Sequence, residues 1–502
     1  MNLTFFKSRH TNILKAFFVI ISILFIVPSI FYLIQNGTIL GYKNYYNFFI
    51  NEGHDKTLSS IVYLILFIVL MAIYLFFINK KDSFKNIKQV LLYAGGVSAI
   101  FVFMLPWNSS DIFYYMGVGE LDSEYRQNPY YVTIKEYCNN NPEVINDDTI
   151  MEQGNINFWA NTTVVYGPIA QIIFSFITRI SFKNVDFCIL LFKILNLLIH
   201  ILNCYIIYKI TKKLKFSIIY GLNPYIMLEF MGMVHNDIIV VFFVLLALYF
   251  LLKKKMLLPS VTFLAIATGI KYFTILLLPV IVLYYYKDEK SILKRLAMCI
   301  IYGIIFILIL LLEYMIYFRD MSIFKAMMVQ TERYCKSIYS GIYAIAMRNK
   351  KPALIAFGKM YMVGDILKKI RNTVLGIFVV LYIKFCIDLL LTREIKINSA
   401  LRKYNLRLVL FILALSNFQQ WYLLWLFATM PWQKPNTIRN IIGISSITQI
   451  ANSIYMFNKE SFLWDIDFIK IILFIFFIWI LCTNKNMKWR NKLEKVIANR
   501  WK

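Results

Sequence analysis

Long apolar stretches alternate with short polar segments along most of this chain. The stretch ILKAFFVIISILFIVPSIFYLI (13–34) contains one charged residue, and IILFIFFIWILC (471–482) contains none. Apolar stretches of about 15–23 residues are long enough to cross a hydrocarbon core as helices. Because helices satisfy their own backbone polar groups in lipid, the pattern predicts an all-α integral membrane protein.

The number of apolar stretches predicts a bundle of about 14 transmembrane helices. The first stretch is longer than a signal peptide and has no small-residue cleavage site, so we expect a permanent span. The segment VVYGPIAQIIFSFITRI (164–180) could be a further span, but we favour a helix that lies at the outer interface. The expected spans lie near residues 13–35, 58–78, 88–106, 186–208, 215–231, 237–252, 257–270, 272–286, 296–318, 373–392, 406–418, 420–432, 438–457 and 466–483.

The composition agrees with a membrane protein. Of the 502 residues, 60% are hydrophobic and 16% are charged, whereas soluble domains carry about a quarter charged residues. The net charge of +27 arises largely from segments between apolar stretches, such as NKKDSFKNIK, KITKKLK and the tail NKNMKWRNKLEKVIANRWK. The positive-inside rule places these segments and both termini in the cytoplasm. We therefore attribute the charge to topology and contact with anionic lipids, and expect no nucleic acid partner.

Two long segments then lie on the outer side of the membrane. Residues 107–165 contain nine acidic residues against Arg126 and Lys135, whereas residues 319–372 are rich in Lys and Arg. An acidic and a basic loop suit a site that handles a hydroxyl and a phosphate, although two solvated loops are an equally open interpretation. The expected organisation is N-terminal transmembrane helices (1–87), a core (88–432) with outer loops 107–185 and 319–372, C-terminal transmembrane helices (433–483) and a basic cytoplasmic tail (484–502).

The sequence indicates no cofactor. The seven cysteines show no CxxC spacing, and the chain has neither a P-loop nor a GxGxxG motif. The acidic loop leaves a divalent metal open, but no ligand set stands out. His235 and Asp237 are two residues apart, which is a poor spacing for two ligands on one helix face.

Several ionisable residues fall at the outer ends of expected spans. Asp111 follows the third span, Glu229 lies within a later one, and His235 and Asp237 lie at its outer turn. Lys271 lies at the next outer turn. Ionisable groups at membrane depth are costly and favour a functional interpretation.

Each of these residues also has a structural interpretation. Asp111 could occupy the first turn of a helix, where the macrodipole favours an acid, and this is compatible with a functional role. The His235 segment could be a polar turn, and Lys271 could reach lipid phosphates. Trp421 and Tyr422 could belong to an interfacial aromatic belt. The functional interpretation gains from the convergence of these groups on one face.

The order of several motifs resembles a known family. Residues SDIFYY (110–115) and NPY (128–130) resemble the first outer loop of polyprenol-phosphate-mannose-dependent mannosyltransferases, which are GT-C class membrane glycosyltransferases. The later motifs resemble those of the α-1,6-mannopyranosyltransferase branch in the same order. They are VYGPIAQ (165–171), LNPYIMLEFMGMVHND (222–237), GIKYFTILLLP (269–279) and QQWYLLW (419–425).

The resemblance implies a GT-C-like bundle with a long first catalytic outer loop that carries interfacial helices. It implies transfer of a hexose, mannose in this family, from a polyprenyl phosphate to a hydroxyl of a lipid-linked or cell-envelope glycan at the outer face of the cell membrane. Asp111 is then the expected general base of an inverting displacement. The expected donor phosphate-binding residues are Lys271, Arg333 and Lys336. The expected sugar- or acceptor-binding residues are Tyr166, His235, Asn236, Asp237, Gln420, Trp421 and Tyr422.

Three alternatives stay open at this point. A flippase or transporter of a lipid-linked sugar would share an apolar groove and cations, although we find no convincing internal repeat. Another GT-C enzyme could move a different sugar, because a few hydroxyl contacts decide specificity. A non-catalytic scaffold would explain the spans but not the ordered polar residues.

Overall fold

The computed structural model describes residues 3–38, 56–80, 83–107, 109–333, 337–348, 353–356 and 359–457. These residues are almost entirely helical, apart from one antiparallel hairpin of β1 (Ala353–Ala356) and β2 (Lys359–Met362). The chain divides into a first unit (1–332 and 452–459) and a second unit (333–451 and 460–502). The domain limits expected from the sequence remain predictions.

Five helices among the described residues are long and apolar enough to cross a membrane, and a bent helix pair would make six. These helices indicate a membrane protein. The predicted count of about 14 spans is not confirmed, and the span expected at 466–483 lies outside the described residues. The five candidate spans are His10–Asn36, Ile61–Asn79, Val185–Thr211, Ile292–Tyr314 and Val363–Leu391.

Several helices at predicted span positions are short, which accounts for much of the difference between the number of predicted spans and the number of long apolar helices. The helix α4 (Ile87–Val102) has 16 residues and rises about 24 Å, less than the roughly 30 Å of a hydrocarbon core. The helices α14 (Leu257–Thr268) and Tyr272–Tyr285, which consists of η3 (Tyr272–Leu277) and α15 (Leu278–Tyr285), are shorter still. Apolar composition predicts burial in lipid or in protein equally well, so the length of a helix is what distinguishes the candidate spans from the shorter apolar helices.

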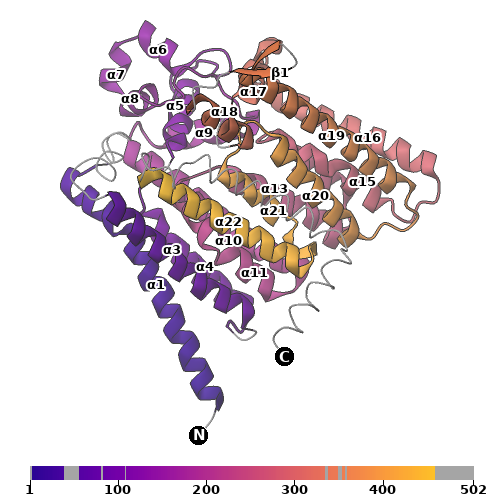
Figure 1. The fold of residues 1–502 in the computed structure, drawn as a ribbon, viewed down its shortest axis with the longest axis horizontal. Helices are drawn as coiled ribbons and strands as arrows, with labels where there is room; N and C mark the ends of the chain where they lie inside the picture. The colour runs from indigo at the N-terminus through magenta and orange to yellow at the C-terminus, as the bar shows by residue number, and fades with distance from the viewer. Residues whose placement is uncertain are drawn as a thin grey trace. The chain divides into compact units, whose positions relative to one another are not determined.

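The first unit is built around α10 (Val185–Thr211), which packs against α4, α11 (Leu214–Gly221) and α13 (Asp237–Tyr249). Beside it, α1 (Leu3–Asn36) and α3 (Lys56–Asn79) lie against each other and α4 packs on α1 (Figure 1). On the other side of α13, α14 packs against α16 (Ile292–Tyr314). The unit continues through η4 (Met321–Phe324) and α17 (Lys325–Glu332).

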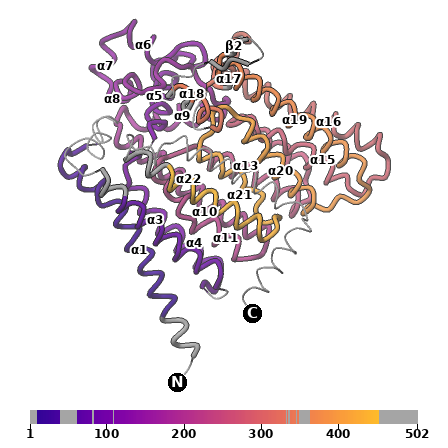
Figure 2. Tube along the Cα trace, in the orientation of Figure 1, coloured from indigo at the N-terminus to yellow at the C-terminus, as the bar shows by residue number. Residues whose placement is uncertain are grey.

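The first long loop folds into five helices. The central one, α5 (Asp111–Ser123), packs against α8 (Thr149–Asn155) and α9 (Pro168–Ile180), as the tube in Figure 2 shows. The approach of α9 requires Gly119, since a Cβ there would lie 2.7 Å from the Phe174 carbonyl oxygen. The remaining two helices are α6 (Ile134–Asn140) and α7 (Glu143–Asp147).

The segment from Pro224 to Lys254 is a broken helix. It begins at α12 (Pro224–Ile226), where the Asn223 side chain accepts a hydrogen bond from the Tyr225 N–H, and continues into the π-helix η1 (Met227–Gly232). After a short break, α13 and η2 (Phe250–Lys254) follow at an angle of 117°. Val234 in the break has φ of 65°, which is uncommon for a β-branched residue.

The second unit contains α18 (Ile338–Arg348), the hairpin, and the long helices α19 (Val363–Leu391) and α20 (Ile397–Ala414), which pack together. Three short helices then fold back on α20: η5 (Gln420–Leu423), α21 (Leu424–Phe427) and η6 (Met430–Trp432). The Arg402 side chain donates to the Trp432 carbonyl at 2.8 Å. The helix α22 (Pro435–Phe457) lies in this unit up to residue 451.

Candidate active site

Asp111 is the first residue of α5. In the first turn of a helix the macrodipole stabilises a carboxylate. Its backbone N–H donates to Ser109 Oγ at 3.3 Å. The side chain is 15% exposed, so the carboxylate reaches the surface of the unit while its backbone is held in place.

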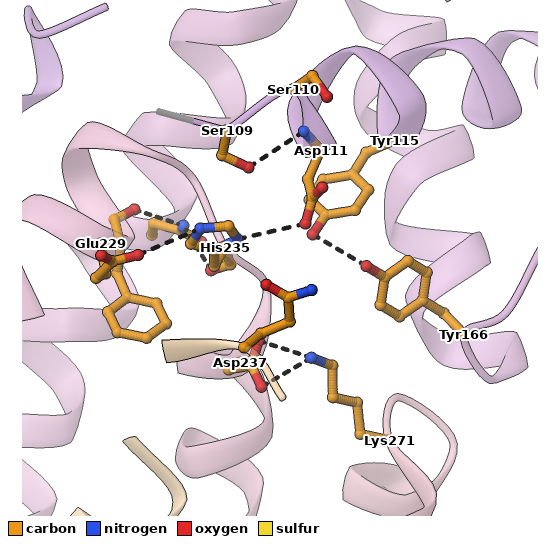
Figure 3. A network of polar contacts seen from close by, with 12 residues as sticks. Ser109, Ser110, Asp111, Tyr115, Tyr166, Glu229, His235, Asp237 and Lys271 are labelled. Carbon is orange, nitrogen blue, oxygen red and sulfur yellow. Dashed lines mark hydrogen bonds and ion pairs between the residues drawn. The ribbon is translucent and has the colours of Figure 1, made fainter. Parts of the chain in front are cut away.

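His235 lies between two carboxyl groups. Its Nδ1 is 3.5 Å from Asp111 Oδ2, and its Nε2 is 3.3 Å from Glu229 Oε2. The side chains of His235 and Glu229 are both fully buried, whereas that of Asp111 is not. The result is a row of carboxyl, imidazole and carboxyl groups that has one end buried and one end accessible (Figure 3).

Lys271 forms the second part of the site. Its Nζ donates to both carboxylate oxygens of Asp237, at 2.8 and 2.7 Å. The Asp237 side chain is fully buried and that of Lys271 is 12% exposed. The ammonium also lies 5.6 Å from the centroid of the Tyr166 ring, within the range of a cation–π contact. His235 and Asp237 thus have different partners.

Tyr166 is brought to Lys271 by contacts between two loops. The Gly167 N–H donates to the Ile270 carbonyl at 3.2 Å, and the Ile169 N–H donates to the Gly269 carbonyl at 2.9 Å. A Cβ on Gly167 would lie only 2.4 Å from the Gly269 carbonyl oxygen, so this approach requires glycine.

The aromatic side of the site joins its two parts. The hydroxyls of Tyr115 and Tyr166 are 3.3 Å apart, and the Tyr130 hydroxyl donates to the Tyr166 carbonyl at 2.9 Å. Figure 3 shows Tyr115 and Tyr166 along one side, with Asp111 toward one end and Lys271 toward the other. The contacts therefore bring together Asp111, His235, Asp237, Lys271 and Tyr166, five of the residues named in the sequence analysis, and their roles remain predictions.

Asn236 lies between His235 and Asp237 in the chain and occupies the N-cap position of α13, where its side chain makes no capping hydrogen bond. It is 3% exposed, and its side-chain amide has no hydrogen-bond partner within the described part of the chain. Burying an amide without a partner is costly, so a ligand hydroxyl at this position would supply the missing hydrogen bonds.

The other predicted site residues belong to the second unit. Gln420 and Trp421 are buried in η5, and the Tyr422 ring stacks on Trp425 with centroids 4.5 Å apart. Arg333 is partly buried, and Lys336 lies outside the described residues. That these residues share a site with Asp111 remains a prediction.

Two contributors were not assigned from the sequence. Glu229 was noted there only as an acid within an expected span, and Tyr115 was not singled out. The contact of Glu229 with His235, six residues later, depends on the π-helix that contains Glu229 and on the break that follows it, because an α-helix brings together residues three or four apart.

A second carboxyl cluster lies at the other end of α5. Glu120 and Asp148 are both fully buried, and Asp148 Oδ2 accepts from the Tyr125 hydroxyl at 2.8 Å and lies 3.5 Å from Lys183 Nζ. Asp148 Oδ1 caps α8 by accepting from the Ile150 N–H. Burial and the adjacent Asp148 carboxylate raise the pKa of Glu120 to about 9.

Neither cluster forms a metal site. Within the part of the chain that the structure describes, no three His, Cys, Asp or Glu side chains converge in a way that could hold a metal ion. The expectation from the sequence, no cofactor with a divalent metal left open, remains a prediction.

The sequence matches a family model described as alpha-(1->6)-mannopyranosyltransferase, N-terminal domain, over residues 22–287. The chain belongs to this family. The family indicates a mannosyltransferase, a glycosyltransferase that moves mannose. All the site residues of the first unit described above lie within the matched segment of this mannosyltransferase. A search of curated proteins and a search of solved structures each found no match.

Proposed function

We propose that this mannosyltransferase takes mannose from a polyprenyl-phosphate donor and transfers it to a hydroxyl of a lipid-linked or cell-envelope glycan. The observation that best supports this is the position of Asp111, which is partly exposed and backed by the buried His235 and Glu229. The family match indicates that the transferred sugar is mannose. The apolar helices suit a donor with an isoprenoid tail, and Lys271 suits its phosphate.

The proposed reaction is a single displacement. The acceptor oxygen forms a bond to the anomeric carbon while the bond from that carbon to the phosphate oxygen breaks, and the electron pair leaves with the phosphate. Asp111 accepts the proton of the acceptor hydroxyl as general base. The leaving group departs as a phosphate anion, so one carboxylate is sufficient, unlike the pair used in glycoside hydrolysis. Attack from the opposite face inverts the anomeric configuration.

His235 and Glu229 act behind Asp111 in this scheme. An imidazole in contact with the carboxylate fixes its orientation, and Glu229 fixes the imidazole in turn. Such support from a neighbouring group is what holds a catalytic side chain within reach of its substrate. Because His235 is fully buried, Asp111 is the member of the row that can meet the acceptor hydroxyl.

Lys271 is the proposed contact for the donor phosphate. Asp237 holds its ammonium in place, and the Lys271 side chain is 12% exposed. Positive charge at this point stabilises the phosphate as its negative charge develops. Arg333 and Lys336 are proposed to add to it. Asn236 and Tyr166 are proposed to contact the sugar or the acceptor, together with Gln420, Trp421 and Tyr422.

The proposed site faces the outer side of the cell membrane, with both termini in the cytoplasm. The helix α9 has 13 residues and is too short to cross the bilayer. It buries Phe174 and Ile177 against the unit and exposes Ile172, Phe176 and Ile180 along one face. An exposed apolar stripe on a short helix suits a position at the membrane surface.

The deciding experiment compares two donors. The purified protein in lipid vesicles receives either polyprenyl-phosphate [14C]mannose or a labelled nucleotide-mannose, with a host lipid extract as acceptor. We expect transfer from the lipid-linked donor alone, and a loss of about 10²–10⁴-fold in rate for Asp111→Asn. Asp147→Asn, an exposed acid of the same loop, is the matched control and should retain the wild-type rate.

Other outcomes overturn parts of the proposal. Transfer from the nucleotide-mannose would refute the lipid-linked donor, and near-normal transfer by Asp111→Asn would refute the base. Movement of the labelled lipid across the vesicle membrane without transfer would favour a flippase.

A further inference from the structure

Lys193 is a lysine buried within the long apolar helix α10. It is 2% exposed, and its ammonium donates to three backbone carbonyls: Met104 at 2.6 Å, Met231 at 2.9 Å and Gly232 at 2.9 Å. All three donors of an ammonium are thereby used on backbone oxygens. A buried charge with this arrangement is costly and favours a functional interpretation.

The three carbonyls belong to the two segments that carry the site. Met104 lies between α4 and Asp111, and Met231 and Gly232 end the π-helix that carries Glu229 and precedes His235. One ammonium therefore joins the backbone that leads to the proposed base with the backbone that leads to its imidazole partner. The same two segments also touch directly, because a Cβ on Gly232 would lie 3.2 Å from Met104 Sδ.

Asn196, almost one turn further along α10, holds the same break. Its side-chain amide donates to the Phe230 carbonyl at 2.8 Å and to the His235 carbonyl at 3.2 Å. Between these two anchored carbonyls lies Val234 with its positive φ. A β-branched residue in this conformation persists only where the surroundings fix the backbone, and Lys193 and Asn196 are the side chains on α10 that do so.

We propose that Lys193 is a positioning residue for mannosyl transfer, because its ammonium sets the separation of Asp111 and His235 by binding both segments. This inference rests on the proposed function. It assigns Lys193 no contact with either substrate. A loss of Lys193 therefore changes the rate of the chemical step and leaves donor binding, which Lys271 serves, nearly unchanged.

The test compares Lys193→Met and Lys193→Arg with the wild type in the vesicle assay. Met keeps the approximate length and removes the charge, whereas Arg keeps a charged donor with several N–H groups. We expect kcat to fall at least about tenfold in Lys193→Met, with the donor KM within about threefold of the wild type. Lys193→Arg should recover part of that loss.

His200→Gln is the matched control. His200 is also buried on α10, and its Nε2 hydrogen-bonds the Gly221 carbonyl at 3.0 Å, outside the two segments. An equal loss of kcat in this variant would show that any buried polar group of α10 matters, and would overturn the positioning role. So would a kcat of Lys193→Met that matches the wild type.

Amide hydrogen exchange separates this inference from the proposed function. In Lys193→Met, residues 104–112 and 230–237 should both exchange faster, and in His200→Gln they should not. Faster exchange of one segment alone, or of neither, would overturn the link between them. If the wild type does not transfer mannose from the lipid-linked donor, the proposed function is wrong. Amide hydrogen exchange then still tests whether Lys193 links the two segments. If Lys193→Met does not fold, Lys193→Arg replaces it, and residues 104–112 and 230–237 should again both exchange faster than in the wild type.

Discussion

Two acids of the helix α5, Asp111 at its start and Glu120 near its end, meet opposite environments. Asp111 lies in the first turn, where the helix dipole stabilises a carboxylate, and it contacts an imidazole. Glu120 lies in the last turn, where the dipole opposes a negative charge, and it is fully buried beside Asp148. One helix therefore presents an accessible carboxylate at its start and a neutral carboxyl group near its end.

The difference separates a chemical role from a structural one. An accessible acid with an imidazole behind it is equipped to take up a proton from a substrate. A buried acid with a raised pKa keeps its proton and contributes to packing. Burial or an unusual pKa alone would have selected Glu120 as the site, whereas access and partners select Asp111.

Among changes that leave Asp111 in place, the largest effect should come from removing the carboxylate of Glu229 behind His235. Glu229→Gln leaves His235 without its second carboxylate. We expect the initial rate of mannosyl transfer to fall about 10–100-fold. Glu120→Gln, the matched change at the other end of α5, should stay within about twofold, because Gln resembles the protonated carboxyl group. Equal losses in the two variants would remove the distinction between the two ends.

The two lysines near α5 should differ in their effect on donor binding. Lys271 belongs to the site at the Asp111 end, and Lys183 pairs with Asp148 at the Glu120 end. Lys271→Met should raise the donor KM about tenfold or more, the worth of one charge-assisted contact. Lys183→Met should leave it unchanged, since that side chain is 44% exposed and serves no substrate. Saturation curves for the lipid-linked donor measure both, and a normal KM in Lys271→Met would contradict its assignment.

The smallest effect concerns stability and pH. Native Glu120 stays protonated up to a pKa of about 9, whereas in the unfolded chain it ionises near its ordinary value. The stabilisation from its raised pKa is complete below that ordinary value and is lost as the pH rises through about 9. The contribution changes by at most about 1.4 kcal/mol per pH unit.

Thermal unfolding midpoints of wild type and Glu120→Gln between pH 5 and pH 9 test this expectation. The wild type should lose stability relative to the variant as the pH rises. Parallel pH profiles of the two proteins would show that Glu120 does not carry the proton.

Much of the site could be predicted from local sequence. The acid after an apolar helix, the polar turn at 235–237 and the lysine at the next turn each carry a local signal, and their order carried the family resemblance. The membrane character followed from the length of the apolar stretches, which α1, α10, α16 and α19 bear out.

What sequence did not supply depends on irregular backbone and on distant contacts. The pairing of Glu229 with His235 needs a π-helix and a break, for which no residue pattern gives a clear signal. The partner of Lys271 is an aspartate 34 residues away. The short helices α4 and α14 are as apolar as the five candidate spans, so hydropathy alone does not decide whether they cross a membrane.

The π-helix at Met227–Gly232 makes the length of this segment as important as its composition. A π-turn holds one residue more than an α-turn. Deleting one residue after Glu229 would remove that extra residue and change the position of Glu229 relative to His235. Substitutions in the segment can be absorbed one side chain at a time, but a change in its length cannot. Proteins that share this site should therefore align through residues 227–237 without a gap, and a gap there would mark a relative with a different arrangement of acids.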